Sequence, residues 1–186
     1  MEQHVSDTYV HILKNELIVA LGCTEPIAIA YAGALARKVL GTVPQRVNVA
    51  CSGNIVKNVK GVTVPNSGGL RGIKVAALLG IAGGDAKKEL AVLESVTDKA
   101  REKARRLLEA GVCTTSLVEG EENLAVTVTA ETCGHTALVE IRGTHTHVAR
   151  IEKDGAVLQS GAPEGGVQKA APDKALLNVR DILTFA

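Results

Sequence analysis

A thiol and a carboxylate lie close together near the start of the chain, at Cys23 and Glu25, with Thr24 between them. An apolar helical pattern stops just before them, and Pro26 begins another. Because proline favours the first turn of a helix, we expect these side chains at a helix N-terminus, with Thr24 or Glu25 as the cap. The partial positive charge there favours a thiolate at Cys23, which can act as a nucleophile or bind a metal. The alternative is that Cys23 only fills space in a buried position.

Other side chains offer weaker chemistry. Glu25 is a candidate general base, although a helix N-terminus lowers the pKa of a carboxylate instead of raising it toward neutrality. His145 and His147 lie two residues apart at the start of a predicted strand and therefore face the same side. With His135 on the preceding strand they could bind zinc, or they could simply be polar surface. No GxSxG motif supports a serine hydrolase.

Residues 66–72 (NSGGLRG) form a predicted loop that leads into the apolar helix expected over 73–82. The backbone N–H groups at such a helix N-terminus can hold a carboxylate or a phosphate, and Arg71 could add donors. The spacing matches neither the dinucleotide fingerprint nor the P-loop. A plain tight turn is the alternative interpretation.

Composition excludes several classes of protein. The net charge is +1, and the chain has no Trp, one Phe and two Tyr, so we expect no nucleic-acid partner. The apolar stretches are too short to span a membrane, and residues 1–20 do not resemble a secretory signal. The four scattered cysteines are typical of reduced thiols in a cytoplasmic protein.

Apolar periodicity predicts an α+β fold, in which an antiparallel sheet (a meander) packs against helices in two layers. The expected helices cover 5–20, 27–40, 73–82 and 85–110, the last capped by Asp85. The expected strands cover 45–51, 112–118, 124–131, 135–142, 147–152 and 156–159. This domain is expected to cover residues 1–160, followed by a linker over 161–173 and, from 174 to 186, the start of a further helical domain.

Four stretches resemble the L-cysteine desulfidases, also described as serine dehydratase alpha-subunit-like proteins. They are ALGCTEPI at 20–27, NIVKN at 54–58 with GVTVP at 61–65, the glycines of 79–84, and GTHT at 143–146 leading to Ile151-Glu152. The resemblance implies an oxygen-sensitive lyase with a [4Fe–4S] cluster. Such enzymes eliminate sulfide from L-cysteine, or water from L-serine, and give pyruvate and ammonia.

The resemblance also implies roles for residues. Cys23 would be one of three cysteine ligands of the cluster, and Glu25, the candidate base from its place beside Cys23, is the expected catalytic residue. The small amino-acid substrate would be held by four polar residues: Thr24, Asn54, Lys57 and Asn58.

Chains of that family are more than twice as long, and their other two ligand cysteines lie in a helical C-terminal half that Cys51, Cys113 and Cys133 do not match. We therefore expect a fragment, a truncated gene product or one subunit of a split enzyme, possessing no intact cluster and little lyase activity alone. Its partner would be the C-terminal half or a partner subunit, with a second copy of the chain, in a homo-oligomer, as an alternative. The alternative is a non-catalytic domain that binds an amino acid or serves in assembly.

Overall fold

The computed structural model describes residues 2–17, 19–120, 123–161 and 174–186. It divides into two compact units, one of Met1–Val19 with Gly165–Ala186, and one of Ala20–Glu164. The first helix is thus grouped with the C-terminal residues, whereas the sequence pattern placed it with the body in residues 1–160. Residues 162–173 of the expected linker lie outside the described residues.

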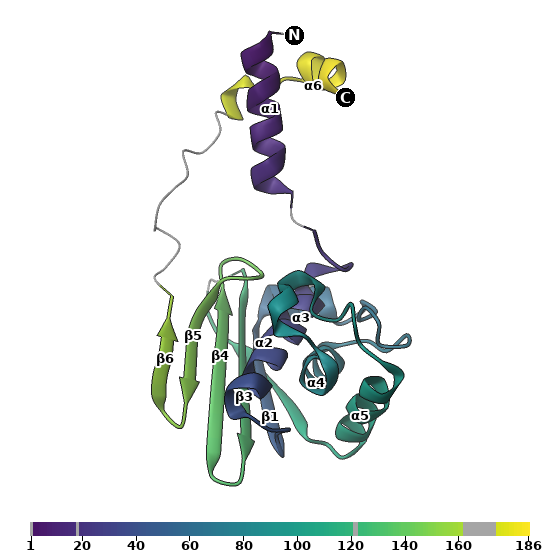
Figure 1. The fold of residues 1–186 in the computed structure, drawn as a ribbon, viewed down its shortest axis with the longest axis vertical. Helices are drawn as coiled ribbons and strands as arrows, with labels where there is room; N and C mark the ends of the chain where they lie inside the picture. Colours follow the sequence, from purple (N-terminus) through teal and green to yellow (C-terminus); the bar gives the residue numbers. More distant parts are fainter. Residues whose placement is uncertain (1, 18, 121–122, 162–173) are drawn as a thin grey trace. The chain divides into compact units, whose positions relative to one another are not determined.

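The larger unit is built on one mixed, mostly antiparallel sheet (Figure 1). Its strands are β1 (Arg46–Ser52), β2 (Cys113–Val118), β3 (Ala125–Thr132), β4 (His135–Arg142), β5 (Val148–Lys153) and β6 (Ala156–Ser160). They lie in the order β2-β1-β3-β4-β5-β6, and β3 to β6 form the predicted antiparallel meander.

The meander does not extend to β2, and this part of the prediction was wrong. β1 lies between β2 and β3 and pairs with β2 in parallel. The difference follows from burial, since Val49 and Cys51 of β1 are fully buried while most of β2 is exposed. The more apolar strand therefore occupies the interior of the sheet, and β2 becomes an edge.

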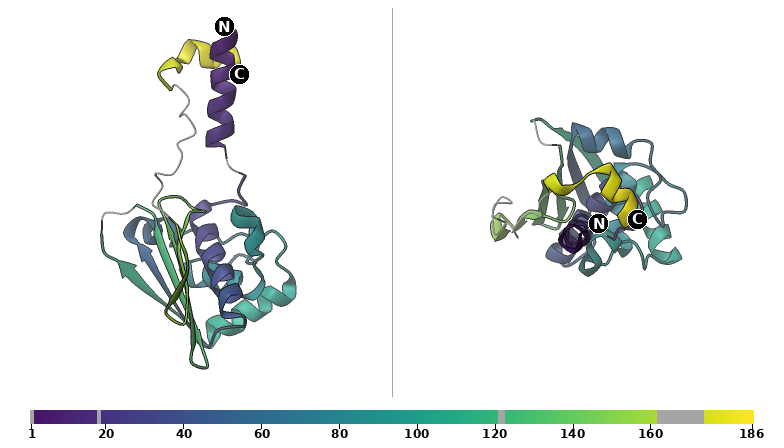
Figure 2. Two further views of the ribbon diagram at one scale, coloured as in Figure 1. Left: turned by 60° about the vertical axis from the view of Figure 1, so that its left-hand side comes forward. Right: turned by 90° about the horizontal axis from the view of Figure 1, so that it is seen from above.

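The helices of the larger unit lie on one face of the sheet and confirm the predicted two-layer α+β class (Figures 1 and 2). They are α2 (Thr24–Leu40), α3 (Gly53–Val59), α4 (Ile73–Gly83), the short 3₁₀ helix η1 (Ala86–Ala91) and α5 (Asp98–Glu109). α2 packs against β3, β4 and α4, and α4 packs against α5. The residues of α2 from Pro26 to Ala34 are all buried, as an all-apolar helix should be.

The single helix expected over 85–110 is broken in two. Asp85 does act as a cap, accepting a hydrogen bond from the Lys87 amide at 3.1 Å, but it caps only η1. α5 begins after Thr97, whose hydroxyl accepts from the Ala100 amide at 3.3 Å. Buried side chains between the two helices at Val92 and Leu93 draw the intervening chain into the core.

α2 and α4 touch backbone to backbone where they cross. A Cβ built on Gly80 would lie 2.0 Å from the carbonyl oxygen of Ala30, and one on Gly33 would lie 2.6 Å from that of Ala77. Only glycine leaves room at both places. α2 is thus packed between α4 on one side and β3 and β4 on the other, and Cys23 lies directly before its first residue.

The smaller unit contains α1 (Gln3–Glu16), the 3₁₀ turn η2 (Lys174–Leu176) and α6 (Val179–Phe185). Tyr9 connects them, because its hydroxyl donates to the Leu176 carbonyl at 3.1 Å and its ring meets Phe185 edge to face. Large apolar side chains nevertheless stay exposed in this unit, among them Leu13, Val179 and Leu183.

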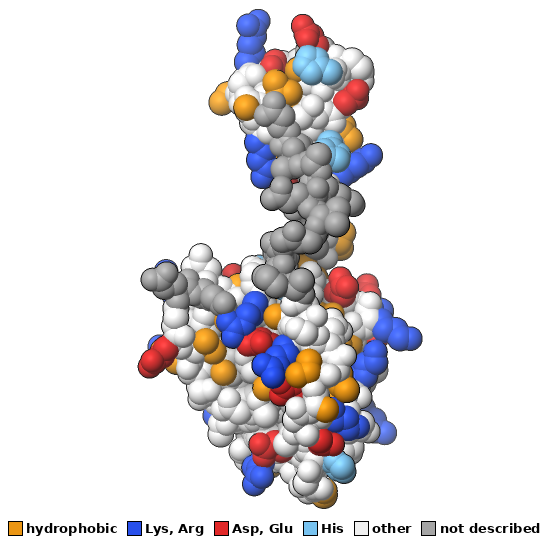
Figure 3. Space-filling view, turned by 90° about the vertical axis from the view of Figure 1, so that its left-hand side faces the viewer, with side chains coloured by type: hydrophobic (Ala, Val, Ile, Leu, Met, Phe, Trp, Pro, Cys, Tyr) orange, Lys and Arg blue, Asp and Glu red, His pale blue; other side chains and the backbone are white. Residues whose placement is uncertain are grey.

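One face of the larger unit carries side chains of both charges (Figure 3). Figure 3 shows acidic and basic side chains interspersed over one face of the larger unit, in agreement with the net charge of +1. Among the described residues, no helix combines the length and the apolar character that crossing a membrane requires.

Candidate functional site

The N-terminus of α2 presents Cys23, Thr24 and Glu25 together. The helix begins at Thr24, and Cys23 occupies the capping position without a hydrogen bond from its side chain to a helix amide. Neither Thr24 nor Glu25 is the cap, so both alternatives predicted from the sequence were wrong. Gly22 precedes them with φ +85°, a left-handed conformation that glycine adopts without strain and that turns the chain into the helix.

The Glu25 carboxylate is the centre of a small hydrogen-bond network. The Cys23 thiol donates to its Oε2 at 3.1 Å, and the Thr24 hydroxyl donates to the same oxygen at 3.3 Å. Asn58 donates from Nδ2 to Oε1 at 3.1 Å. Because Asn58 belongs to α3, the carboxylate fixes α3 to the N-terminus of α2 through side chains 33 residues apart.

This network shifts two ionisable groups in opposite directions. The hydrogen bond from Cys23, helped by Asn58 and the nearby His145 ring, outweighs burial and lowers the pKa of Glu25. Burial, reinforced by the bond to Glu25, raises the pKa of the Cys23 thiol. From the helix terminus alone, the sequence predicted a lowered pKa for the Cys23 thiol, and this prediction was wrong. In this chain alone Cys23 is therefore held as a thiol.

His145 is the residue that sequence reasoning missed at this site. It lies in the turn between β4 and β5, close enough to Glu25 to lower the pKa of that carboxylate. Its Nε2 atom is buried and has no hydrogen-bond partner among the described residues. His145 is part of the GTHT stretch that carries the resemblance, which could have indicated a role at this site. The sequence analysis considered it only as a zinc ligand.

The three-histidine zinc site is contradicted by the structure. His135 begins β4 and its Nδ1 is hydrogen-bonded to Asp154 at 3.0 Å, whereas His145 follows the other end of that strand. His147 is bonded through Nδ1 to the Arg142 carbonyl. Within the described ranges, no three His, Cys, Asp or Glu residues are grouped so that they could hold a metal ion.

Asn54 and Lys57 are exposed on α3 and form no hydrogen bond with Cys23 or Glu25 in the described part of the chain. Asn54 lies one helical turn before Asn58, and Lys57 lies beside it. The structure thus brings Cys23, Thr24, Glu25 and Asn58 into contact, and leaves Asn54 and Lys57 along the edge of the same site.

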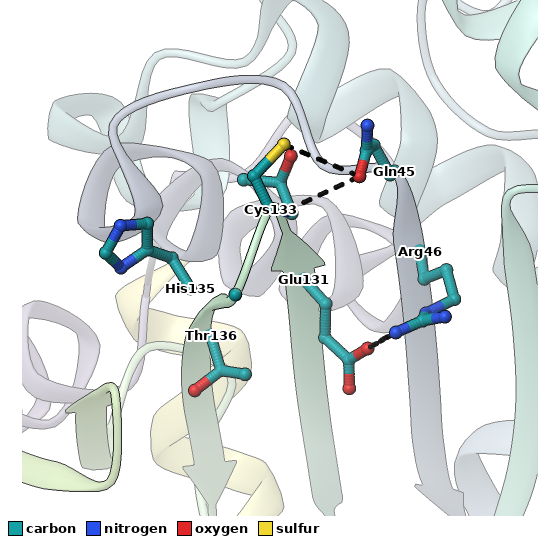
Figure 4. Close-up of a pocket in the computed structure, with 8 residues that line it drawn as sticks. Gln45, Arg46, Glu131, Cys133, His135 and Thr136 are labelled. Atoms are coloured by element: carbon teal, nitrogen blue, oxygen red, sulfur yellow. Dashed lines mark hydrogen bonds and ion pairs between the residues drawn. The ribbon is translucent and has the colours of Figure 1, made fainter.

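The remaining cysteines are elsewhere. Cys51 and Cys113 are buried in β1 and β2, and burial raises the pKa of their thiols to about 12 and about 11. Cys133 is exposed in the β3–β4 turn and contacts the side-chain oxygen of Gln45 (Figure 4). Figure 4 shows the His135 ring turned away from this sulfur, and its Nδ1 is hydrogen-bonded to Asp154 instead.

Known proteins similar to the chain are named only as UPF0597 proteins. That of Lachnoclostridium phytofermentans is 47% identical over 177 residues, that of Finegoldia magna 47% over 151, and that of Treponema denticola 38% over 187. The matches cover 95%, 81% and 100% of this chain. The chain is similar to UPF0597 proteins.

The chain spans only 42%, 36% and 43% of the length of these three UPF0597 relatives. No protein-family model and no solved structure matches it. The chemistry of the UPF0597-like chain therefore has to be argued from its own residues.

Thiol labelling tests the electrostatics of the four cysteines. Under native conditions at pH 8, iodoacetamide should label exposed Cys133 first and Cys23 more slowly, because the raised pKa of Cys23 leaves little thiolate. Cys51 and Cys113 should react only after unfolding. Peptide mass spectrometry over time gives the order, and Glu25→Gln should accelerate labelling at position 23 alone. Cys23 reacting as fast as Cys133 in the unaltered chain would contradict the assigned network.

The lowered pKa of Glu25 predicts a dependence of stability on pH. The ionised carboxylate stabilises the fold above the usual pKa of 4.5, and this contribution is lost as the pH falls through the lower folded value. Glu25→Gln should therefore lose less stability than the unaltered chain between pH 5 and 3. Urea unfolding at several pH values measures this, with exposed Glu109→Gln as the control. Parallel curves for Glu25→Gln and the unaltered chain would contradict the prediction.

Proposed function

We propose that the chain is the N-terminal part of an iron–sulfur-dependent lyase that eliminates sulfide from L-cysteine, or water from L-serine. One observation carries the proposal. Three of the stretches that resemble the desulfidases lie far apart in sequence, yet they meet at one site through Cys23, Asn58 and His145 around Glu25. The fourth stretch supplies Gly80, where α4 touches α2.

The described residues fit a [4Fe–4S] cluster only in part. Cys23 is a partly exposed thiol in a polar site and could supply one of the cysteine ligands of the cluster. Cys51 and Cys113 are buried in the sheet, and the described residues gather no set of three ligands. The remaining ligands would come from the C-terminal half or a partner subunit. When bound, the cluster would supply a Lewis acid for the leaving group.

The residues of this chain would bind and orient the amino acid. Asn58, Asn54 and Lys57 offer donors to a carboxylate along one side of α3, and the Thr24 hydroxyl belongs to the same polar network through its bond to Glu25. Elimination removes the proton from Cα and breaks the bond from Cβ to sulfur or oxygen. The resulting aminoacrylate then hydrolyses to pyruvate and ammonia.

The geometry changes the role proposed for Glu25. A carboxylate with a lowered pKa is a weak base at neutral pH, and its oxygens already accept bonds from Cys23, Thr24 and Asn58. We therefore assign Glu25 to positioning Cys23 and Asn58. The buried Nε2 of His145, which has no partner in the part of the chain that the structure describes, would be the better acceptor for the Cα proton, because imidazoles commonly transfer protons at neutral pH.

Anaerobic iron–sulfur reconstitution in cytoplasm-like reducing buffer tests the proposal. The chain would be reconstituted alone and with the C-terminal half of a UPF0597 relative supplied in trans. We expect visible cluster absorption, and sulfide release from L-cysteine or pyruvate formation from L-serine, only when the half is present. Halves that associate but form no cluster and release no product would overturn the proposal and favour an amino-acid-binding or assembly domain.

A further inference from the structure

A hollow with an apolar floor and basic side chains around it lies on the other side of α3 from Asn58. It has a volume of about 330 Å³ and opens between α3, α4, α5 and β2. Val56 and Lys60 of the α3 region line it, whereas Asn58, which contacts Glu25, is about 200° around the same helix from Val56. The hollow is therefore separate from the site of the proposed function.

Three cations surround this hollow: Lys60, Arg71 and Lys74. No carboxylate lines it, and in the part of the chain that the structure describes none of the three forms an ion pair. Some other basic side chains of the same unit have acidic partners, as Arg46 has Glu131 and Lys88 has Glu94. Three like charges around one hollow repel one another unless an anion lies between them.

The backbone that carries these cations is held in place. Arg71 forms a β-bridge with Thr63, and the Leu70 carbonyl beside it accepts from the Val64 amide at 2.9 Å and the buried Ser67 hydroxyl at 3.0 Å. Lys74 lies in the first turn of α4, whose amides have no side-chain cap. The backbone around Arg71 and the first-turn amides of α4 are thus fixed before a ligand binds, which lowers the cost of binding.

The floor of the hollow is apolar. Four hydrophobic residues line it, namely Val56, Ile73, Val75 and Leu108. Such a surface suits the hydrocarbon part of a ligand, while a few polar groups at the rim fix its orientation. Free inorganic anions would use the rim alone.

We propose that this hollow binds a small organic anion. Its phosphate or carboxylate group is held by Lys60, Arg71 and Lys74, and its apolar part lies against the floor. Arg71 can donate two parallel hydrogen bonds to either group, and the two lysines add charge. The site is independent of Cys23 and of any cluster, so it can be tested in this chain alone.

Calorimetric titration and amide NMR with three probes test the proposal: phenyl phosphate, phenylacetate and inorganic phosphate. We expect at least one aromatic probe to bind about tenfold more tightly than inorganic phosphate and to shift the amide signals of residues 72–75. Tighter binding of phenyl phosphate identifies a phosphate ester as the ligand class, and tighter binding of phenylacetate identifies a carboxylate.

Variants distinguish binding at this hollow from non-specific attraction of anions to basic side chains. Arg71→Gln and Lys74→Gln should each weaken binding about tenfold, whereas Lys38→Gln, an exposed lysine at the end of α2, should leave it unchanged. All three positions are exposed, so thermal unfolding should confirm an intact fold. The proposal is overturned if no probe binds, if inorganic phosphate binds as tightly as both aromatic probes, or if Lys38→Gln weakens binding as much as Arg71→Gln.

Discussion

Gly80→Ala should destabilise the larger unit by about 3 kcal/mol, the upper end of the usual effect of overpacking a core. The added Cβ would lie 2.0 Å from the backbone oxygen of Ala30, and a backbone atom cannot turn aside as a flexible side chain can. α2 and α4 would have to separate along their whole crossing. Since most of α2 is buried between α4 and the sheet, this separation would disturb contacts on both sides of the helix.

Urea unfolding followed by circular dichroism measures this effect. Gly53→Ala is the matched control, because a Cβ on Gly53 meets nothing within 4 Å, and its stability should change by less than about 1 kcal/mol. Gly33→Ala should fall between the two, since its Cβ would lie 2.6 Å from the Ala77 oxygen. If Gly80→Ala unfolds at the same urea concentration as Gly53→Ala, the helices do not cross as closely as described.

The elements of the fold could largely be predicted from local pattern. Alternating residues marked the strands, and the apolar run after Pro26 marked α2 as buried. The pairing of strands could not be predicted in this way, because alternation shows which side chains face the core but not which strand lies alongside. The position of β1 between β2 and β3 is therefore known only from the structure.

The break before α5 is a different kind of failure. Thr97 followed by Asp98 is a helix-start signal that the sequence already carried, and Thr97 does cap α5. It was outweighed by an apolar periodicity that seemed to run on from Leu90 to Leu108. In the structure, Leu90 and Leu93 instead reach the core from η1 and the turns after it.

The candidate site was predictable only in part, and its long-range members needed the resemblance. Residue patterns alone singled out Cys23 and Glu25, whereas Asn58 entered through the resemblance and His145 was seen only as a metal ligand. The pKa direction of Cys23 failed for a physical reason. Burial and a neighbouring carboxylate are properties of the folded chain, and here they outweigh the helix terminus that the sequence could show.

Cys23→Ser should abolish cluster formation and reduce lyase activity more than about 100-fold in the chain reconstituted with the C-terminal half, since even changes outside the ligand shell reduce metal binding 10- to 100-fold. A serine hydroxyl is a poor ligand for iron in such clusters, where thiolates are required. It can still donate to the Glu25 carboxylate as the thiol does, so the network with Asn58 and the fold should survive.

Cys133→Ser is the control for this prediction, because it removes an exposed thiol outside the site and should keep both cluster and activity. Glu25→Gln separates positioning from ligation, since it keeps the Cys23 thiol but removes the carboxylate that fixes it. That variant should form a cluster and lose activity. Cluster absorption that persists in Cys23→Ser would remove Cys23 from the ligand set and with it the main role proposed for the N-terminus of α2. Absorption that disappears in Cys133→Ser would instead assign a ligand role to Cys133.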